Sequence, residues 1–214
     1  MKGSTHLAIG TAIGIAASIY YPFDPVHAAY YVAASAFSAI SADLDGTNML
    51  SSKLGKVSHR IRESALWLGL LALGAGGWLY SAGNPNYPAL AAGGIGLVLL
   101  GLILKEGAVR NALVSLCGVG LLYAGWRSHS TGLIGLGVFV AWAPWLNHRG
   151  LTHTVWAALA WAFIAAAFER QLHVEGLGAA ATAGYLSHLV ADTLTPGGVK
   201  WLYPIVKKSI KLSF

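Results

Sequence analysis

Long apolar segments, separated by short polar connections, run through nearly the whole chain. Gly- and Pro-rich turns mark several of these connections, for example at 21–25 and 83–86. Most segments approach the roughly 20 residues that a helix needs to cross the hydrocarbon of a bilayer. The pattern predicts eight helices, at 7–21, 27–42, 64–81, 88–104, 110–126, 131–146, 151–168 and 177–194.

The composition turns this pattern into a membrane prediction. Of the 214 residues, 56% are hydrophobic and only 10% are charged, whereas a soluble domain carries about 25% charged residues. We therefore expect an all-α, polytopic transmembrane bundle of about eight helices that forms a single domain over 1–214. The first apolar segment is expected to be a retained helix rather than a cleaved signal peptide, because His6 fits the candidate site described below. Cys117 lies in an apolar run and is expected to be a packing residue.

The distribution of positive charge predicts the orientation in the membrane. If the chain starts inside and crosses eight times, all of its 14 Lys and Arg residues except Arg127 and Arg170 lie on the inside. This bias is the one seen in cytoplasmic loops, so both termini are expected to be cytoplasmic and the protein to lie in the cell (inner) membrane. Lys207, Lys208 and Lys211 are expected to contact anionic lipid, and no direct binding of nucleic acid is expected.

The ionisable residues gather at the inside ends of the predicted helices. The stretch 147–153 reads NHRGLTH and lies between two apolar segments. Odd-numbered helices start inside and even-numbered helices end inside, so the residues at these ends share one face of the membrane. These residues are His6, Asp43, Asp45, His59 in the following basic loop, His148, His153, His188 and Asp192.

The spacing of these residues constrains how they can meet. His188 and Asp192 are four residues apart, about 40° around a helix, so they share a face; a simple hydrogen bond between them is the alternative to ligation. His148 and His153 cannot share a helix face, which places His148 in a loop, Thr152 near a helix cap and His153 in the first turn. Asp43 and Asp45 can point together only if the helix has ended before them, and a plain helix-terminating turn at SADLDG is equally compatible.

Imidazole and carboxylate ligands in this number favour a metal centre. Neutral imidazole and carboxylate suit zinc, iron or manganese, and five to seven such groups exceed the three or four of a single zinc site. The sequence thus predicts one or two divalent ions, zinc first, with manganese or iron as alternatives. Arg149 can bind a phosphate or serve only as a positive charge on the inner side of the membrane. His59 is either a member of the site or a surface charge.

Several other chemistries are not supported. The chain has no nucleophile elbow, no P-loop and no His-Glu-x-x-His motif. A transporter is expected to hold ionisable residues near the middle of the bilayer, whereas these lie at helix ends. Isolated histidines such as His27, His129 and His173 are expected to be interfacial or packing residues.

Four motifs resemble those of the YdjM-like family of bacterial and archaeal membrane proteins. They are His6 after Thr5, the SADLDG run, HRGLTH, and SHLVADTLTPGG followed by WLYP at 201–204. The family is described as LexA-binding, inner-membrane-associated, metal-dependent hydrolases, distantly similar to zinc-dependent phospholipase C and P1 nuclease. The family commonly has Pro before its first Asp, where this chain has Ala42. The resemblance implies metal binding by His6, Asp43, Asp45, His148, His153, His188 and Asp192.

The expected function is metal-dependent hydrolysis of a phosphoester or lipid head group at the cytoplasmic membrane face. A metal ion would activate water, Asp45 would serve as general base, and Arg149, His59 or Lys200 would hold the phosphate. The expected partners are the lipid bilayer and a lipid-phosphate substrate. The alternatives are a non-catalytic, metal-stabilised membrane protein that binds a cytoplasmic regulatory protein, and a metal or ion transporter.

Overall fold

The computed structural model describes residues 1–46 and 52–212, and within these ranges the fold is all-α with eight α-helices and one antiparallel bridge between Val199 and Ile210. The all-α character and the number of helices are therefore confirmed. The α-helices are α1 (Gly3–Tyr20), α2 (Pro25–Ser41), α3 (Ser52–Ser81), α4 (Tyr87–Ile103), α5 (Glu106–Arg127), α6 (Thr131–Trp142), α7 (Val155–Leu172) and α8 (Leu177–Thr193). Three short 3-10 helices are η1 (Ala42–Asp45), η2 (Ala143–Trp145) and η3 (Leu151–His153).

Several helix boundaries differ from the prediction by a few residues, and two of these differences have identifiable reasons. Helix α3 begins at Ser52 rather than 64, because the basic stretch 52–63 has good helix formers although it lacks a continuous apolar run. Helix α7 begins at Val155 rather than 151, since the side chain of Thr154 caps it by accepting a hydrogen bond from the backbone of Ala157. Thr152 and His153 therefore precede the helix, which corrects the expectation that His153 lies in its first turn.

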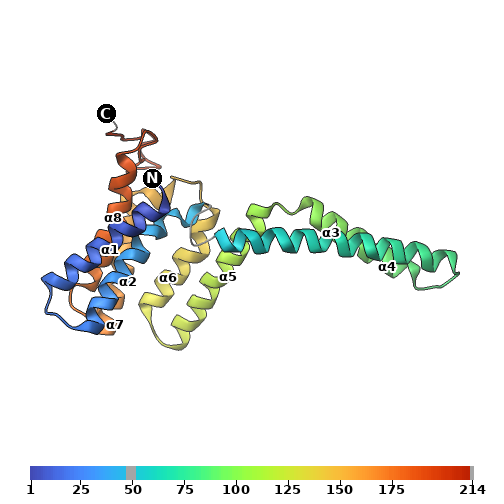
Figure 1. The fold of residues 1–214 in the computed structure, drawn as a ribbon, viewed down its shortest axis with the longest axis horizontal. Coiled ribbons are helices and arrows are strands. Elements are labelled where there is room, and N and C mark those ends of the chain that lie inside the picture. The colour runs from blue at the N-terminus through green and yellow to red at the C-terminus, as the bar shows by residue number, and fades with distance from the viewer. Residues whose placement is uncertain (47–51, 213–214) are drawn as a thin grey trace. The chain divides into compact units, whose positions relative to one another are not determined.

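The chain divides into two compact units, Met1–Ser51 with Val114–Phe214, and Ser52–Leu113. In the first unit α1, α2, α7 and α8 lie side by side, and α6 packs on α7 (Figure 1). In the second unit α3 and α4 form an antiparallel pair (Figure 1), and the Arg62 side chain donates a hydrogen bond to the carbonyl of Gly101 across the pair. All candidate site residues except His59 lie in the first unit.

The core of the first unit ends directly beside the candidate site. Trp161 of α7 stacks on Tyr185 of α8 with ring centroids 5.1 Å apart, and its indole N–H donates to Oγ of Ser38 in α2 at 2.9 Å. The Tyr185 hydroxyl donates to the carbonyl of Thr152. Three helices are thereby fixed against η3, the segment that carries His153.

Close packing of α1 against α2 depends on small residues. Gly14 is buried, and a Cβ built on it would lie 2.4 Å from Cα of Val32.

We expect Gly14→Ala to destabilise the protein by about 1–3 kcal/mol, because the two backbones would have to move apart. Thermal unfolding of the purified variant measures this. Gly74→Ala is the matched control, since nothing lies within 4 Å of its added Cβ; an equal effect at both positions would contradict the packing argument.

Two helices in the described ranges, Ser52–Ser81 and Gly107–Arg127, are long and apolar enough to cross a membrane by length and composition. Tyr87–Ile103 and Thr131–Trp145 are apolar but shorter. Helices α1, α2, α7 and α8 are rich in Ala and Gly, small residues that allow helix backbones to approach closely.

Candidate metal centre

The 3-10 helix η1 brings two carboxylates to the site. Helix α2 ends at Ser41, and the chain continues in a tighter turn that carries Asp43 and Asp45, as expected if the helix ends before them. Ala42 begins this turn and is fully buried, so the turn forms without a Pro at this position. The two carboxylates then contact opposite nitrogens of one imidazole: Oδ1 of Asp43 lies 3.6 Å from Nε2 of His153, and Oδ2 of Asp45 lies 3.4 Å from its Nδ1.

The turn before η3 wraps around Asp45. Arg149 has a φ of 57°, a left-handed conformation that aims its backbone N–H at Oδ2 of Asp45, 3.0 Å away. The Thr152 hydroxyl donates to the same oxygen at 2.6 Å, and Nδ1 of His148 lies 2.8 Å from Oδ1. Both oxygens of Asp45 are thus occupied. These contacts favour an orienting role for Asp45 over its predicted role as general base.

Four ligand atoms from three segments converge at the centre of the site. The Nε2 atoms of His153 and His188 lie 3.2 Å apart. Oδ1 of Asp43 lies 3.6 and 3.5 Å from these two nitrogens, and Oδ2 of Asp192 lies 3.8 and 3.9 Å from them. His188 and Asp192 share a face of α8, as their spacing predicts.

These separations fit a tetrahedral metal ion. Ligand atoms placed tetrahedrally about 2.0–2.2 Å from zinc lie about 3.3–3.6 Å from one another. The five separations above range from 3.2 to 3.9 Å, so each carboxylate lies at ligand distance from both imidazole nitrogens. Asp43 and Asp192 belong to different groups of possible ligands among the described residues. Both imidazoles are fully buried, which protects the site from competing water. The residues present therefore fit the predicted divalent ion.

A backbone carbonyl fixes the orientation of His188. Its Nδ1 lies 2.7 Å from the carbonyl oxygen of Ala39, and since a carbonyl only accepts, Nδ1 carries the proton. Nε2 of a neutral His188 is therefore free of hydrogen and faces the centre. Such bonds to the far nitrogen are typical of histidines that bind metals.

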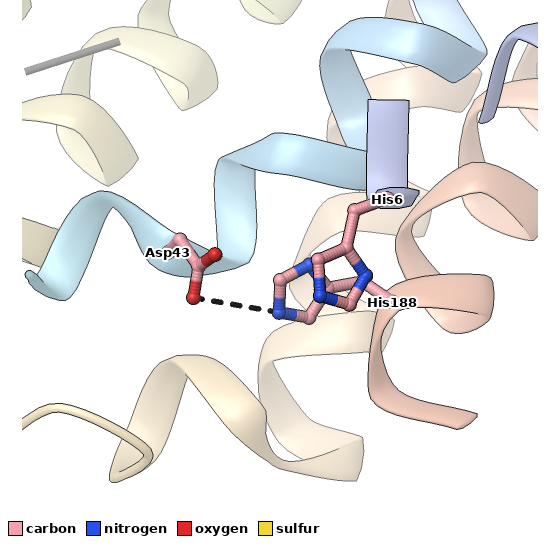
Figure 2. Close-up of side chains that lie close together, drawn as sticks. All are labelled: His6, Asp43 and His188. Atoms are coloured by element: carbon pink, nitrogen blue, oxygen red, sulfur yellow. Dashed lines mark ion pairs between the residues drawn. The ribbon is translucent and has the colours of Figure 1, made fainter. Parts of the chain in front are cut away.

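His6 of α1 adds a further imidazole next to this set. Its ring stacks on His188 with centroids 3.8 Å apart (Figure 2), and its Nε2 lies 3.4 Å from Oδ1 of Asp192. His6 is buried, and among the described residues none hydrogen-bonds to its Nδ1. Because a buried nitrogen without a partner is costly, this atom is another candidate for a ligand.

The ligand atoms form three overlapping groups that could each hold an ion. His153, His188 and Asp192 form one group, and His6 with Asp43 and His188 forms a second. The third group, Asp43, Asp45 and His148, lies at the exposed edge of the site. Asp43 belongs to two of these groups, so it is the carboxylate best placed to bridge two ions.

Electrostatic coupling within the cluster changes its proton affinities. Burial alone would lower the pKa of His153, but hydrogen bonds to Asp43 and then Asp45 outweigh it and raise the pKa to about 9. Burial likewise acts to raise the pKa values of Asp43 and Asp45, whereas their hydrogen bonds with His153 hold both below the usual range. Without metal, the imidazole of His153 is therefore expected to be doubly protonated and positively charged at neutral pH.

Zinc affinity is expected to depend on pH for this reason. Below about pH 9 zinc must displace the proton of His153, so its apparent affinity should rise by about tenfold per pH unit between pH 7 and 9 and then level off. Competition with a zinc-sensitive dye across this range measures the slope. A zinc affinity independent of pH would contradict a protonated His153 in the metal-free protein.

The remaining charged groups lie around the cluster or away from it. The Arg149 guanidinium contacts Oδ2 of Asp192 at 3.0 Å, and the amino group of Met1 contacts Oδ1 at 2.8 Å. His59 belongs to the second unit, where it pairs with Glu63 at 3.1 Å, so its membership of the site stays a prediction. Lys200 is exposed and lies over the ring of Tyr203. The metal-ligand groups found among the described residues do not include His27, His129 or His173.

Sequence reasoning did not foresee two supporting contacts. Thr152 bonds Asp45 and also lies 3.0 Å from Nδ1 of His153, and the Ala39 carbonyl orients His188. Thr152 could have been suspected from its place inside the HRGLTH stretch. The carbonyl carries no signal in the sequence, since every residue has one.

Comparison with known proteins agrees with the resemblance seen in the motifs. No curated protein and no solved structure matches the chain. The family model described as YdjM inner membrane protein matches residues 1–214. The chain therefore belongs to the YdjM inner membrane protein family.

Proposed function

We propose that this chain is a multi-pass membrane protein with a metal-dependent hydrolase site for a phosphoester at the cytoplasmic membrane face. Membership of an inner membrane protein family supports localisation to the inner membrane. The observation that carries the proposal is the convergence of two imidazole nitrogens and two carboxylates at ligand-to-ligand distances next to an accessible edge. A divalent ion bound there would polarise a phosphoryl oxygen and acidify water.

The accessible edge supplies the groups that would handle substrate. The His148 side chain is 56% exposed, Arg149 is 28% exposed and Asp43 is 20% exposed, whereas His153, His188 and Asp192 are buried. A substrate would therefore approach along the turn that carries His148 and Arg149. The guanidinium of Arg149 suits a phosphate, which it can bind with two parallel hydrogen bonds.

His148 is the candidate for proton transfer. Its Nδ1 lies 2.8 Å from the buried carboxylate of Asp45, which would orient the ring. The opposite nitrogen then faces the exposed edge, where it can take a proton from water or give one to a leaving group. In this arrangement Asp45 acts as a positioning residue for both His148 and His153.

The experiment that tests the proposal combines metal analysis with a phosphoester screen. Purified protein is expected to contain about one or two zinc, manganese or iron ions per chain and to hydrolyse a phosphomonoester or phosphodiester only when loaded. Turnover without metal, or turnover by a His153→Ala variant that equals the unmodified protein, would contradict the proposal.

Arg149 provides a more specific prediction. We expect Arg149→Met to raise KM for a phosphoester by about tenfold or more, because a charge-assisted contact with phosphate is lost, while zinc content changes little. Met is unbranched like Arg, so it adds no β-branching at the left-handed position. Steady-state kinetics with elemental analysis measures both quantities. Arg170→Met, at an exposed position near the end of α7, is the control and should leave KM unchanged.

The close spacing of the buried imidazoles and carboxylates also favours a second candidate function, a structural metal site. An ion held tetrahedrally by four protein ligands would have no open position. Such a protein would bind a regulatory partner without turnover. Metal-dependent stability with no activity on any phosphoester would support this candidate over the hydrolase.

A further inference from the structure

An apolar groove begins at the polar turn of the candidate site. It has a volume of about 190 Å³ and lies between α6–η2 on one side and η3–α7 on the other. Its walls include Phe139, Trp142 and Leu146 from the first side and Leu151, Trp156 and Ala157 from the second. The lining is almost entirely apolar, because the hydroxyl of Thr152 donates its hydrogen bond to Asp45 and not into the groove.

The groove borders the turn that carries His148 and Arg149. Leu146 and Leu151 both line it, and they directly flank the four residues 147–150 that carry His148 and Arg149. Thr152 also lines it and donates its hydroxyl hydrogen to Asp45 at 2.6 Å. One ligand could therefore place a charged group at the turn and an apolar group in the groove.

We propose that this groove binds the hydrocarbon chain of a lipid phosphoester whose phosphate lies at His148 and Arg149. The inference rests on the proposed function and specifies its substrate as a long-chain lipid phosphate. Trp142 and Trp156 both line the groove and are 59% and 44% exposed. The groove is small for a whole ligand, so it holds the first part of the chain, and the rest leaves toward the bilayer past these two indoles.

A larger cavity in the same unit does not offer this connection. It measures about 330 Å³ and is lined mainly by α2 and α7. Trp161 lines it, and the stack of Trp161 on Tyr185 together with the bond from Trp161 to Ser38 lies between this cavity and the candidate site. A hydrocarbon chain there could not continue to a phosphate at Arg149 without breaking these contacts.

The test compares two phosphonate analogues of phosphatidic acid, which cannot be hydrolysed, in the zinc-loaded full chain in one detergent. One analogue carries two oleoyl chains and the other two acetyl chains, which cannot fill the groove. The unmodified protein is expected to bind the dioleoyl analogue about tenfold or more tightly, because only its chains contact the apolar walls of the groove. Ala157→Phe fills the groove and should remove this preference without changing the affinity for the diacetyl analogue.

Two further variants keep the test decisive. Ala160→Phe places the same ring at an exposed position of the groove, so it should fold even if Ala157→Phe does not, and it should also reduce the preference. Ala16→Phe, at an exposed position of α1 away from both cavities, should leave the preference unchanged. A dioleoyl analogue with a photoreactive diazirine in its chain should label residues within 139–160.

Three results would overturn the groove: equal affinity for both chain lengths, an unchanged preference in Ala160→Phe, or labelling of the α2–α7 cavity instead. Turnover gives an independent readout on the proposed hydrolase. Equal turnover of long-chain and short-chain phosphoesters would contradict binding of the chain in the groove but not the proposed hydrolysis. A retained preference for long chains with no turnover of any phosphoester would contradict hydrolysis but not binding of the chain in the groove.

Discussion

A His153→Ala variant is expected to bind zinc at least about a hundredfold more weakly than the unmodified protein and to lose measurable phosphoester hydrolysis. His153 is the residue on which both carboxylates of η1 converge, and its Nε2 faces Nε2 of His188 at 3.2 Å. Its removal deletes a ligand atom and also leaves Asp43 and Asp45 without the contact that lowers their pKa values. Two defects therefore arise from one substitution.

Isothermal titration with zinc and a metal-loaded activity assay measure the two effects. His27→Ala is the matched control, because His27 lies in the first turn of α2 and belongs to none of the metal-ligand groups found among the described residues. If His153→Ala bound zinc as tightly as His27→Ala, the convergence of ligand atoms would have no functional meaning.

Removal of metal is expected to lower the melting temperature by about 8–16 °C relative to protein in a thousandfold excess of free zinc over its Kd. Binding at that excess stabilises the folded state by about 4 kcal/mol, and each kcal/mol shifts the melting temperature by about 2–4 °C in a chain of this size. The stabilisation would arise because the ion joins residues of η1, η3 and α8, which separate on unfolding.

Thermal unfolding in detergent with a chelator, and then with zinc restored, measures this shift. The His153→Ala variant should show little response to either treatment, which separates the site from nonspecific effects of the chelator. Equal melting temperatures with and without zinc would contradict both the hydrolase and the structural metal site. The experiment therefore tests the ion itself, independently of the reaction.

Eight helices and the gathering of the site residues could be predicted from local patterns. Apolar runs identify helices because each spans one element, and the four-residue spacing of His188 and Asp192 fixes their common face. The start of α3 at Ser52 was missed, because a basic amphipathic stretch does not look like an apolar run. The start of α7 was placed too early, because Thr152 and Thr154 are equally good caps by composition.

The geometry of the centre could not be predicted, since it depends on contacts between residues far apart in the chain. The Ala39 carbonyl orients His188 across 149 positions, and Thr152 reaches Asp45 across 107 positions. No periodic pattern encodes such pairs. The contacts of Asp45 illustrate the difficulty: its two oxygens accept hydrogen bonds from or contact Thr152, His148 and Arg149, and its predicted role as general base stays a prediction.

The distribution of the ligands along the chain has a consequence for biosynthesis. His6 lies in the first helix and Asp192 in the last, yet their side chains are 3.4 Å apart. His6 is synthesised before Asp192, so a nascent chain that ends before α8 lacks His188 and Asp192. The proposed ion would therefore bind only after α8 has been synthesised, and a chain truncated before α8 is expected not to retain it.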